Sequence, residues 1–465
     1  MDWIRKNTHM SVADLATFEY QPQRCRVLQV PQDVATQTIR SEHVMTEDEW
    51  KRIFELERKA AMRSGHCGGS AILASRVAEE SDDKENYHDP SILSKLPFSE
   101  ETWSHVLDIF HVHGSAAKLI NRARSCVFSR TPLTLNDTST PMIVYNCRSS
   151  SSWPEDLALS MTWFPGRKFW YAIFYGCDKA IENEIAGRIR SSEDAICHPL
   201  LLPGIFAELE RRRHLKMVRN ASDTLMETVT GLNNNHRLAS NLSRAPKHGV
   251  NSTPWQDSEQ APGTDREVDP WLDIVHMKNG LENWKEQLAK MVAHADELNT
   301  TNFSHDVSQD PTTQAFHSLM RDTGRRIKER LQDIIHEYDE KIRDCNRNLD
   351  GMTLANQVAH TKVNMEIASR TKEDSTQMKS IALLTMVFLP ATFLATVFSM
   401  SFFNWQPDSE KGEAEVSPKI WIYAVIAGIV TLMTFLAWYW FIKGRHAWRA
   451  RQQLGEENEL SVYRV

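Results

Sequence analysis

Cysteine is sparse in this chain and shows no pairing pattern. The seven cysteines are scattered, odd in number and never arranged as Cys-x-x-Cys. A disulfide framework in a secreted protein uses an even set of cysteines, and a structural zinc site uses closely spaced pairs. We therefore predict reduced thiols in a cytosolic domain and assign no metal site to the soluble part of the chain.

The glycine-rich and catalytic motifs of common enzymes are also missing. The sequence contains no Gly-x-Gly-x-x-Gly, Gly-x-x-x-x-Gly-Lys-Ser/Thr, Gly-x-Ser-x-Gly or His-Glu-x-x-His motif, which argues against the chemistry that these motifs support. Positive charge is not in excess either, since the formal net charge is −7, and a nucleic-acid-binding face needs a basic cluster. We expect neither an enzyme nor a nucleic-acid-binding protein, and no covalently bound cofactor.

Charge is absent altogether from two long stretches near the C-terminus. The first is the apolar run 381–403, IALLTMVFLPATFLATVFSMSFF, and the second is 420–442, IWIYAVIAGIVTLMTFLAWYWFI. A helix of about 23 residues is about 35 Å long, which is enough to cross a bilayer core of about 30 Å. We predict two transmembrane helices that form a hairpin in membrane lipid.

The flanking charges predict the orientation of this hairpin. Basic residues dominate the tail, 443–465, whereas acidic residues dominate the connecting loop, 404–419. By the positive-inside rule, both termini lie in the cytosol and the acidic loop lies outside it. The loop either raises the cation concentration at a pore mouth or is an ordinary polar hairpin loop. Its acidic residues are Asp408, Glu410, Glu413 and Glu415.

The N-terminal residues, MDWIRKNTHM, lack the apolar region of a secretory signal. They are also a poor match to an Arg- and Ser-rich transit peptide. We therefore expect an integral membrane protein whose large N-terminal part stays in the cytosol. Its expected location is the plasma membrane rather than the mitochondrial inner membrane.

The rest of the chain predicts an α+β fold. Residues 1–232 combine strand-like runs with amphipathic helices, and we expect a cytosolic α/β domain with a trailing helix. Within it, Pro165-Gly166 separates the apolar runs Leu157–Phe164 and Lys168–Tyr175 and so predicts a β-hairpin. The following segment, 233–268, is rich in Asn, Ser, Pro and Gly, and we expect a disordered linker or a long loop there.

Residues 269–380 predict a helical stalk that is continuous with the first transmembrane helix. A helix from about Thr312 meets no strong stop, because Gly351 weakens it by only about 1 kcal/mol. Apolar residues recur along this helix in alternating steps of three and four, which is a seam of the coiled-coil type. The seam residues are Leu331, Ile334, Tyr338, Ile342, Cys345, Leu349 and Met352.

One face of the first transmembrane helix carries hydroxyl groups on an otherwise apolar segment. Such a stripe is expected on a helix that faces water in a pore. Alternatively, each threonine bonds a carbonyl of its own helix and can then face anything. A single hairpin cannot enclose a polar path, so a conducting protein needs a symmetric oligomer with this helix innermost. The stripe consists of Met378, Ile381, Thr385, Leu389, Thr392, Thr396 and Ser399.

These segments resemble the CorA family of divalent cation channels, in its fungal branch. Pro390-Ala391-Thr392-Phe393 matches the family's Pro-x-Thr-Phe element, and 398–402, FSMSF, occupies the place of its aromatic-Gly-Met-Asn signature. The resemblance implies a homopentamer with a cytosolic funnel, in which the first span lines the pore and the second forms an outer ring. It further implies Mg²⁺ or another divalent cation as both transported and regulatory ion, with uptake driven by the membrane potential.

The resemblance also implies roles for residues at matching positions. Ser399, Met400 and Ser401 correspond to the ion filter, and the stripe from Met378 to Thr396 corresponds to the pore lining. The basic collar at the inner pore mouth corresponds to Lys379, Lys443, Arg445 and Arg449.

The signature of this chain differs from the family pattern in two places. Its Gly and Asn are both serine here, at Ser399 and Ser401, and a serine hydroxyl reaches less far toward the pore axis than an asparagine carbonyl. These substitutions and the long segments 79–90 and 233–269 favour one alternative. In that hypothesis, the chain is a non-conducting, membrane-anchored scaffold or regulatory protein on a CorA-like fold.

Overall fold

The computed structural model describes eleven segments of the chain. These are residues 9–30, 39–61, 67–77, 92–122, 126–135, 140–150, 153–192, 195–242, 265–304, 310–399 and 420–462. The acidic segment 79–90 and the loop 404–419 lie outside the described residues. The chain divides into two compact units, Met1–Ala355 and Asn356–Val465.

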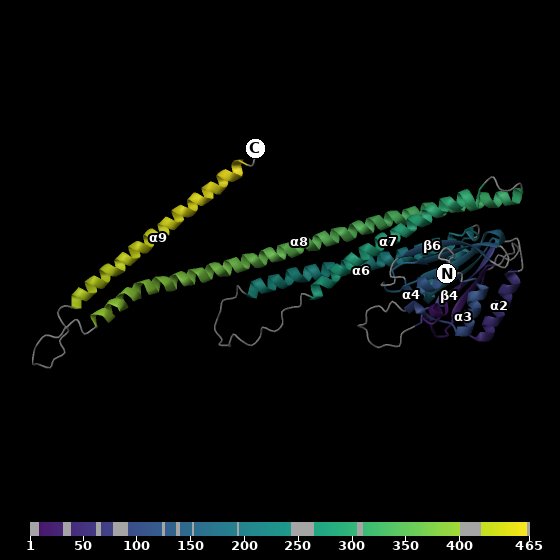
Figure 1. The fold of residues 1–465 in the computed structure, drawn as a ribbon, viewed down its shortest axis with the longest axis horizontal. Coiled ribbons are helices and arrows are strands. Elements are labelled where there is room, and N and C mark those ends of the chain that lie inside the picture. The colour runs from purple at the N-terminus through teal and green to yellow at the C-terminus, as the bar shows by residue number, and fades with distance from the viewer. Residues whose placement is uncertain are drawn as a thin grey trace, which may run out of the picture. The chain divides into compact units, whose positions relative to one another are not determined.

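The first unit contains all the strands of the described segments (Figure 1). The strands are β1 (Glu19–Tyr20), β2 (Cys25–Val30), β3 (Arg40–Val44), β4 (Gly68–Ser75), β5 (Lys95–Leu96), β6 (Val127–Leu135), β7 (Thr140–Arg148), β8 (Ala158–Phe164) and β9 (Phe169–Cys177). The α-helices are α1 (Val12–Leu15), α2 (Glu47–Ala61), α3 (Glu100–Ile109), α4 (Ser115–Arg122), α5 (Lys179–Arg190), α6 (Leu201–Leu242), α7 (Asp265–Thr301), α8 (Pro311–Phe398) and α9 (Ile420–Val462). Short 3-10 helices cover Ile92–Ser94 and Pro165–Arg167.

Seven strands form one mixed sheet in the order β3-β2-β4-β9-β8-β7-β6. Neighbouring strands are antiparallel except β4 and β9, which are parallel. The predicted hairpin is confirmed, because β8 and β9 pair across the turn Pro165–Arg167, with Phe164 opposite Phe169. The α+β fold class is confirmed as well.

Helices cover both faces of this sheet, which explains why β9 is buried along its whole length. Side chains alternate between the faces of a strand, so Tyr171 and Ile173 pack with α2, α3 and α4, whereas Trp170 and Ala172 pack with α5, α6 and α7. A strand that is covered on both faces shows continuous rather than alternating hydrophobicity. The two cores therefore lie on opposite sides of a single sheet.

A capping box opens α2. The backbone N–H of Glu49 donates to Oγ1 of Thr46 at 3.4 Å, and the N–H of Thr46 donates to Oε2 of Glu49 at 3.0 Å. These reciprocal bonds satisfy two N–H groups that lack partners within the helix. The helix consequently begins at Glu47.

Helices α6, α7 and the first half of α8 run side by side (Figure 1). Arg211 of α6 donates to Glu337 of α8 at 2.8 Å, and Lys285 of α7 donates to Asp339 of α8 at 2.9 Å. The predicted seam of α8 is buried from Leu331 to Met352, apart from the partly buried Leu349. It therefore packs against helices of the same chain, and the structure of this one chain shows no coiled coil between subunits.

The prediction of a disordered linker at 233–268 is wrong at both ends of this range. Helix α6 continues to Leu242 and α7 begins at Asp265, while residues 243–264 lie outside the described part of the chain. The reason is that extending an existing helix orders one residue for each hydrogen bond gained, so a helix can continue through weak helix formers. The stalk is confirmed as continuous with the first apolar span, because α8 passes through Gly351 without a break and ends at Phe398.

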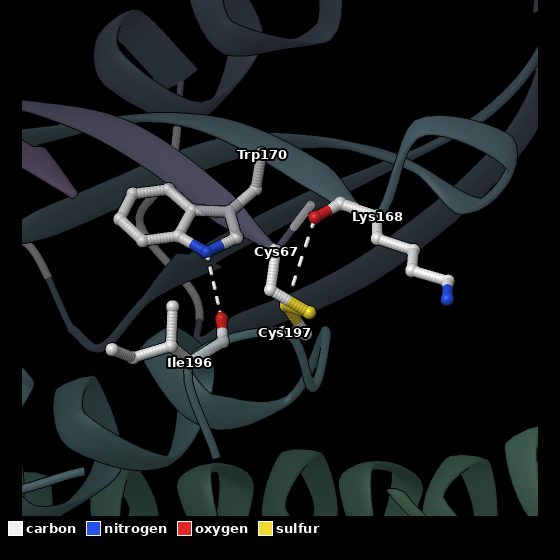
Figure 2. The surroundings of a disulfide bond; sticks show 5 residues. All are labelled: Cys67, Lys168, Trp170, Ile196 and Cys197. Atoms are coloured by element: carbon white, nitrogen blue, oxygen red, sulfur yellow. Dashed lines mark hydrogen bonds between the residues drawn. A yellow bond between two sulfur atoms is a disulfide. The ribbon is translucent and has the colours of Figure 1, made fainter. Parts of the chain in front are cut away.

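The prediction that all the thiols are reduced is also wrong. Cys67 and Cys197 form a disulfide, although 130 positions separate them in the sequence (Figure 2). The fold brings their Cα atoms to 5.6 Å, which lies within the range that a disulfide requires. The other five cysteines are free and buried. The spacing of cysteines along the chain could not reveal a contact that only the folded sheet creates.

A pH dependence of stability follows from His198, which is fully buried where the chain enters α6. Burial, and to a lesser degree the charge of His294, lowers the pKa of His198 to about 3. In the unfolded chain, the imidazole of His198 has its ordinary pKa of about 6.5. The contribution of His198 to the free energy of unfolding is therefore constant above pH 6.5 and falls as the pH drops toward 3. Lowering the pH from 7 to 5 is expected to reduce the free energy of unfolding by up to about 2 kcal/mol through His198.

Urea unfolding of the full-length protein in detergent, followed by tryptophan fluorescence at pH 5 to 8, measures this effect. The His198→Gln variant is expected to lose part of the decline between pH 6.5 and pH 5 and to match the wild-type slope above pH 7. Identical slopes in both proteins throughout the range would contradict the assignment.

Candidate functional site

The second unit contains two helices that are long and apolar enough to cross a membrane. They are the end of α8 and the first half of α9, and none of the most apolar part of either is buried. The core helix of a soluble protein would bury such a surface, whereas Leu389 is 69% exposed and Phe441 is 63% exposed. An apolar surface of this extent marks contact with a membrane or with another protein, and we conclude that the chain is a membrane protein.

The α8 span has one side turned toward α9. Its half-buried positions include Met386, Pro390, Leu394 and Val397, which recur at steps of four, four and three. At the same level, the hydroxyl of Tyr423 in α9 donates to the carbonyl oxygen of Ala391 at 3.0 Å. Packing between the two helices thus occupies one side of α8 and leaves the other side uncovered.

The predicted stripe lies on the uncovered side. All seven stripe residues are exposed, with Met378 at 65% and Leu389 at 69%. At about 100° per residue, the stripe lies roughly 150° around the helix from the half-buried positions. The side of α8 that carries the hydroxyl groups therefore points away from α9.

The hydroxyl groups of the stripe donate to their own helix. Thr385 donates to the carbonyl of Ala382 at 2.9 Å, Thr392 to that of Phe388 at 2.9 Å, and Thr396 to that of Phe393 at 2.7 Å. This arrangement is the structural alternative that the sequence left open. It uses the only proton of each hydroxyl but leaves oxygen lone pairs free to accept, so the stripe offers acceptors and no free threonine donors.

The collar and filter residues are only partly described. Lys379 is exposed, but it follows Met378 directly and so points about 100° away from that residue. Lys443 lies over the ring of Tyr439, with 5.9 Å between Nζ and the ring centroid. The helix α9 carries Arg445 and Arg449 beyond the second apolar run, although their side chains lie outside the described residues. Met400, Ser401 and the four acidic loop residues also lie outside them.

The stalk carries a second exposed, uncharged stripe that the sequence analysis missed, and at about 100° per residue it lies roughly 150° around a straight helix from the stripe Met378–Ser399. Leu354, Val358, Thr361 and Met365 are exposed and recur at steps of four, three and four. On a straight helix, such a heptad-like stripe drifts by about 20° per heptad, so it stays on one side only if helices wind around one another. The signal that could have identified it is the recurrence of uncharged residues at heptad-like steps.

Among the residues that the structure describes, no group of three or more His, Cys, Asp or Glu side chains could hold a metal ion. Hydroxyl and carbonyl oxygens are also ligands for hard divalent cations. The uncharged stripe of α8 is the surface that offers such groups.

Part of the chain is similar to a known protein family. Residues 297–443 match the model of the CorA-like Mg²⁺ transporter protein family, and no curated protein matches the chain. Two solved structures share 12% sequence identity with the chain. One is the full-length CmaX protein, with a TM-score of 0.34 and coverage of 90% of this chain and 97% of that chain. The other is the cytoplasmic domain of ZntB from Vibrio parahaemolyticus, with a TM-score of 0.28 and coverage of 71% and 100%.

The matched family is described as one of Mg²⁺ transporters. The matched residues cover the end of α7, all of α8 and the apolar part of α9, which are the elements that build the candidate site. Over this segment the chain is similar to the CorA-like Mg²⁺ transporters.

Proposed function

We propose that this chain is the subunit of a membrane channel or transporter for divalent metal cations, with Mg²⁺ as the transported ion. The observation that carries the proposal is the exposed, uncharged stripe of α8, which points away from α9 and offers free oxygen acceptors. It lies within the segment that matches a family of Mg²⁺ transporters. The proposed location is the plasma membrane, with both termini in the cytosol.

Self-association follows from the exposure of the stripe. One hairpin cannot surround an aqueous path, so several copies of α8 must face a common axis, with α9 outside. The stalk stripe from Leu354 to Met365 is a further exposed apolar surface that another copy of the chain would cover. We propose a homopentamer, as the family resemblance implies.

The chemistry of the stripe suits a hydrated divalent cation. Mg²⁺ gives up its water ligands reluctantly, and bound water presents hydrogen atoms to its surroundings. The hydroxyl oxygens of Thr385, Thr392 and Thr396 can accept these hydrogens while their own protons stay bonded to the helix. Ser399, Met400 and Ser401 would continue the acceptor lining as the ion filter.

The membrane potential is the proposed driving force. A potential of 100 mV favours entry of a divalent ion by about 4.6 kcal/mol, which is twice the value for a single charge. The loop acids Asp408, Glu410, Glu413 and Glu415 would concentrate cations at the outer mouth. At the inner mouth, Lys379, Lys443, Arg445 and Arg449 would form the basic collar.

Transport by the purified full-length protein in liposomes tests the proposal. With a Mg²⁺-sensitive dye inside and an imposed inside-negative potential, protein-containing liposomes are expected to fill faster than empty ones. Flux equal to that of empty liposomes would favour a non-conducting, membrane-anchored scaffold or regulatory protein. A monomer or dimer in detergent, measured by light scattering, would contradict the pore architecture.

The filter assignment makes a narrower prediction. Ser401→Ala removes one proposed acceptor, and we expect it to change flux or the selectivity for Mg²⁺ several-fold. Thr431→Ala is the matched control, because Thr431 on α9 is half-buried and donates to the carbonyl of Ala427 at 2.7 Å. Equal, negligible effects of both substitutions would remove Ser401 from the filter. The liposome assay with competing cations measures both variants.

A further inference from the structure

The disulfide lies where three segments of the first unit meet (Figure 2). Cys67 immediately precedes β4, and Cys197 lies between α5 and α6. The carbonyl oxygen of Lys168, in the β8–β9 turn, is 3.7 Å from Sγ of Cys197 and accepts the backbone N–H of Gly68 at 3.3 Å. This single carbonyl therefore links both sides of the disulfide.

The residues around the disulfide are tightly packed. The indole N–H of Trp170 donates to the carbonyl of Ile196 at 2.8 Å (Figure 2). On its other side the same ring lies against Gly69, where an added Cβ would be 2.2 Å from the indole. The residues beside both cysteines are thus held by one tryptophan, so a change at the sulfur atoms is transmitted to their neighbours.

Two contacts connect this junction to the first turns of α8. Next to Cys197, the ring of His198 lies so close to Gly324 that an added Cβ there would be 2.9 Å from Nε2. The side chain of Lys168 reaches the same helix, with Nζ 3.9 Å from the ring centroid of Phe316. Both neighbours of the disulfide therefore contact α8, the helix that continues as the candidate pore helix.

Cys67 differs from the other six cysteines in accessibility. Cys67 is half-buried, whereas Cys197 and all five free cysteines are buried. Burial raises the pKa of Cys25 and of Cys126 to about 12, so these free thiols stay protonated at neutral pH and react slowly. An external thiol therefore reaches Cys67 before any other cysteine in the described part of the chain.

We propose that Cys67 and Cys197 form a reversible thiol–disulfide exchange site, which reacts with a low-molecular-weight thiol of the glutathione class and thereby anchors or releases the start of α8. The cytosol keeps exposed thiols reduced, so a disulfide in a domain on that side of the membrane would respond to the ambient thiol and disulfide concentrations. The inference does not require that the protein transport ions.

Reduction of the Cys67–Cys197 disulfide by an external thiol takes two exchange steps. An external thiolate attacks Sγ of Cys67, the Cys67–Cys197 bond breaks, and Cys197 leaves as a thiolate that takes up a proton. A second external thiolate attacks the external sulfur of the mixed disulfide and releases the Cys67 thiolate, which is protonated in turn. Two external thiols are thus oxidised to one external disulfide, and the protein disulfide is reduced to two thiols. The new thiol of Cys197 can then donate to the carbonyl of Lys168 that already faces it.

The test uses the full-length protein in detergent, equilibrated with either oxidised or reduced glutathione. Differential alkylation and mass spectrometry are expected to find Cys67 and Cys197 linked under oxidising conditions and free under reducing conditions. Hydrogen–deuterium exchange is expected to speed up by about tenfold in residues 311–330 of the reduced wild-type protein, because the anchor of these residues is lost. The comparison of the two wild-type states carries the test without any variant.

Two variants sharpen the result. Cys67→Ala is expected to show the fast exchange of residues 311–330 in both buffers. Cys345→Ala is the control, because Cys345 is a free, buried cysteine of α8 itself, and this variant is expected to keep the redox response. The proposal is overturned if Cys67 and Cys197 stay free with oxidised glutathione, or if exchange in 311–330 is equal in the two wild-type states.

Discussion

Replacing Thr392 by lysine is expected to reduce divalent cation flux by at least about 100-fold. Thr392 lies on the exposed stripe of α8, and every subunit of an oligomer would place one lysine near the axis. At an effective dielectric constant of about 40, a unit charge about 8 Å from a divalent ion raises the energy of that ion by about 2 kcal/mol. Each 1.4 kcal/mol of added barrier slows flux tenfold. The lysines of two subunits together add about 4 kcal/mol, which is more than a 100-fold reduction in flux requires.

The liposome assay measures this loss, and two further variants at the same position define its cause. Thr392→Ser keeps the acceptor oxygen and is expected to stay within about threefold of wild type. Thr392→Val keeps the shape but removes the acceptor, and an intermediate flux is expected. Quantifying the inserted protein excludes a defect in membrane insertion. Wild-type flux through Thr392→Lys would show that this residue does not face the conduction path.

Removing the carboxylate of Asp156 is expected to destabilise the first unit by about 3–5 kcal/mol. Arg148 is 1% exposed, and its Nε donates to Oδ2 of Asp156 at 3.0 Å. A second bond joins its Nη2 to the same oxygen, while its Nη1 donates to the carbonyls of Leu119 and Ile120 at 2.5 Å each. Asp156→Ala would leave this guanidinium buried without its counter-charge.

Urea unfolding of the full-length protein measures the effect, and a double variant tests the mechanism. Arg148→Met combined with Asp156→Leu removes both charges, and we expect it to be clearly more stable than Asp156→Ala alone. Glu42→Ala is the surface control, because its partner Arg52 is 61% exposed, and less than about 1 kcal/mol is expected there. If the double variant is as unstable as Asp156→Ala, the lost packing of the side chains rather than the unpaired charge of Arg148 causes the loss of stability.

The elements that the sequence predicted correctly depend on neighbouring residues. The turn Pro165–Arg167 follows from two adjacent residues, and the continuous helix through Gly351 follows from the absence of a strong helix stop. The apolar spans likewise follow from length and the absence of charge. The candidate stripe was also predictable, because i, i+3 and i+4 positions share a helix face wherever the helix lies.

One error is local, and the others concern contacts between distant segments. The linker ends were helical because existing helices extended into them. The seam from Leu331 to Met352 was recognised, but its partners, α6 and α7 of the same chain, were not. The disulfide joins cysteines 130 positions apart, and no local spacing predicts such a pair.

By itself, the sequence determined that the chain has two apolar spans, a helix that continues into the first of them, and a hydroxyl stripe on that helix. These properties are local, since they depend on composition and on helical period. Only the tertiary structure decided that the stripe points away from α9, that its threonine protons are bonded internally, and that Cys67 meets Cys197 beside α8. These features depend on which surfaces pack together, and packing joins residues that the sequence keeps far apart.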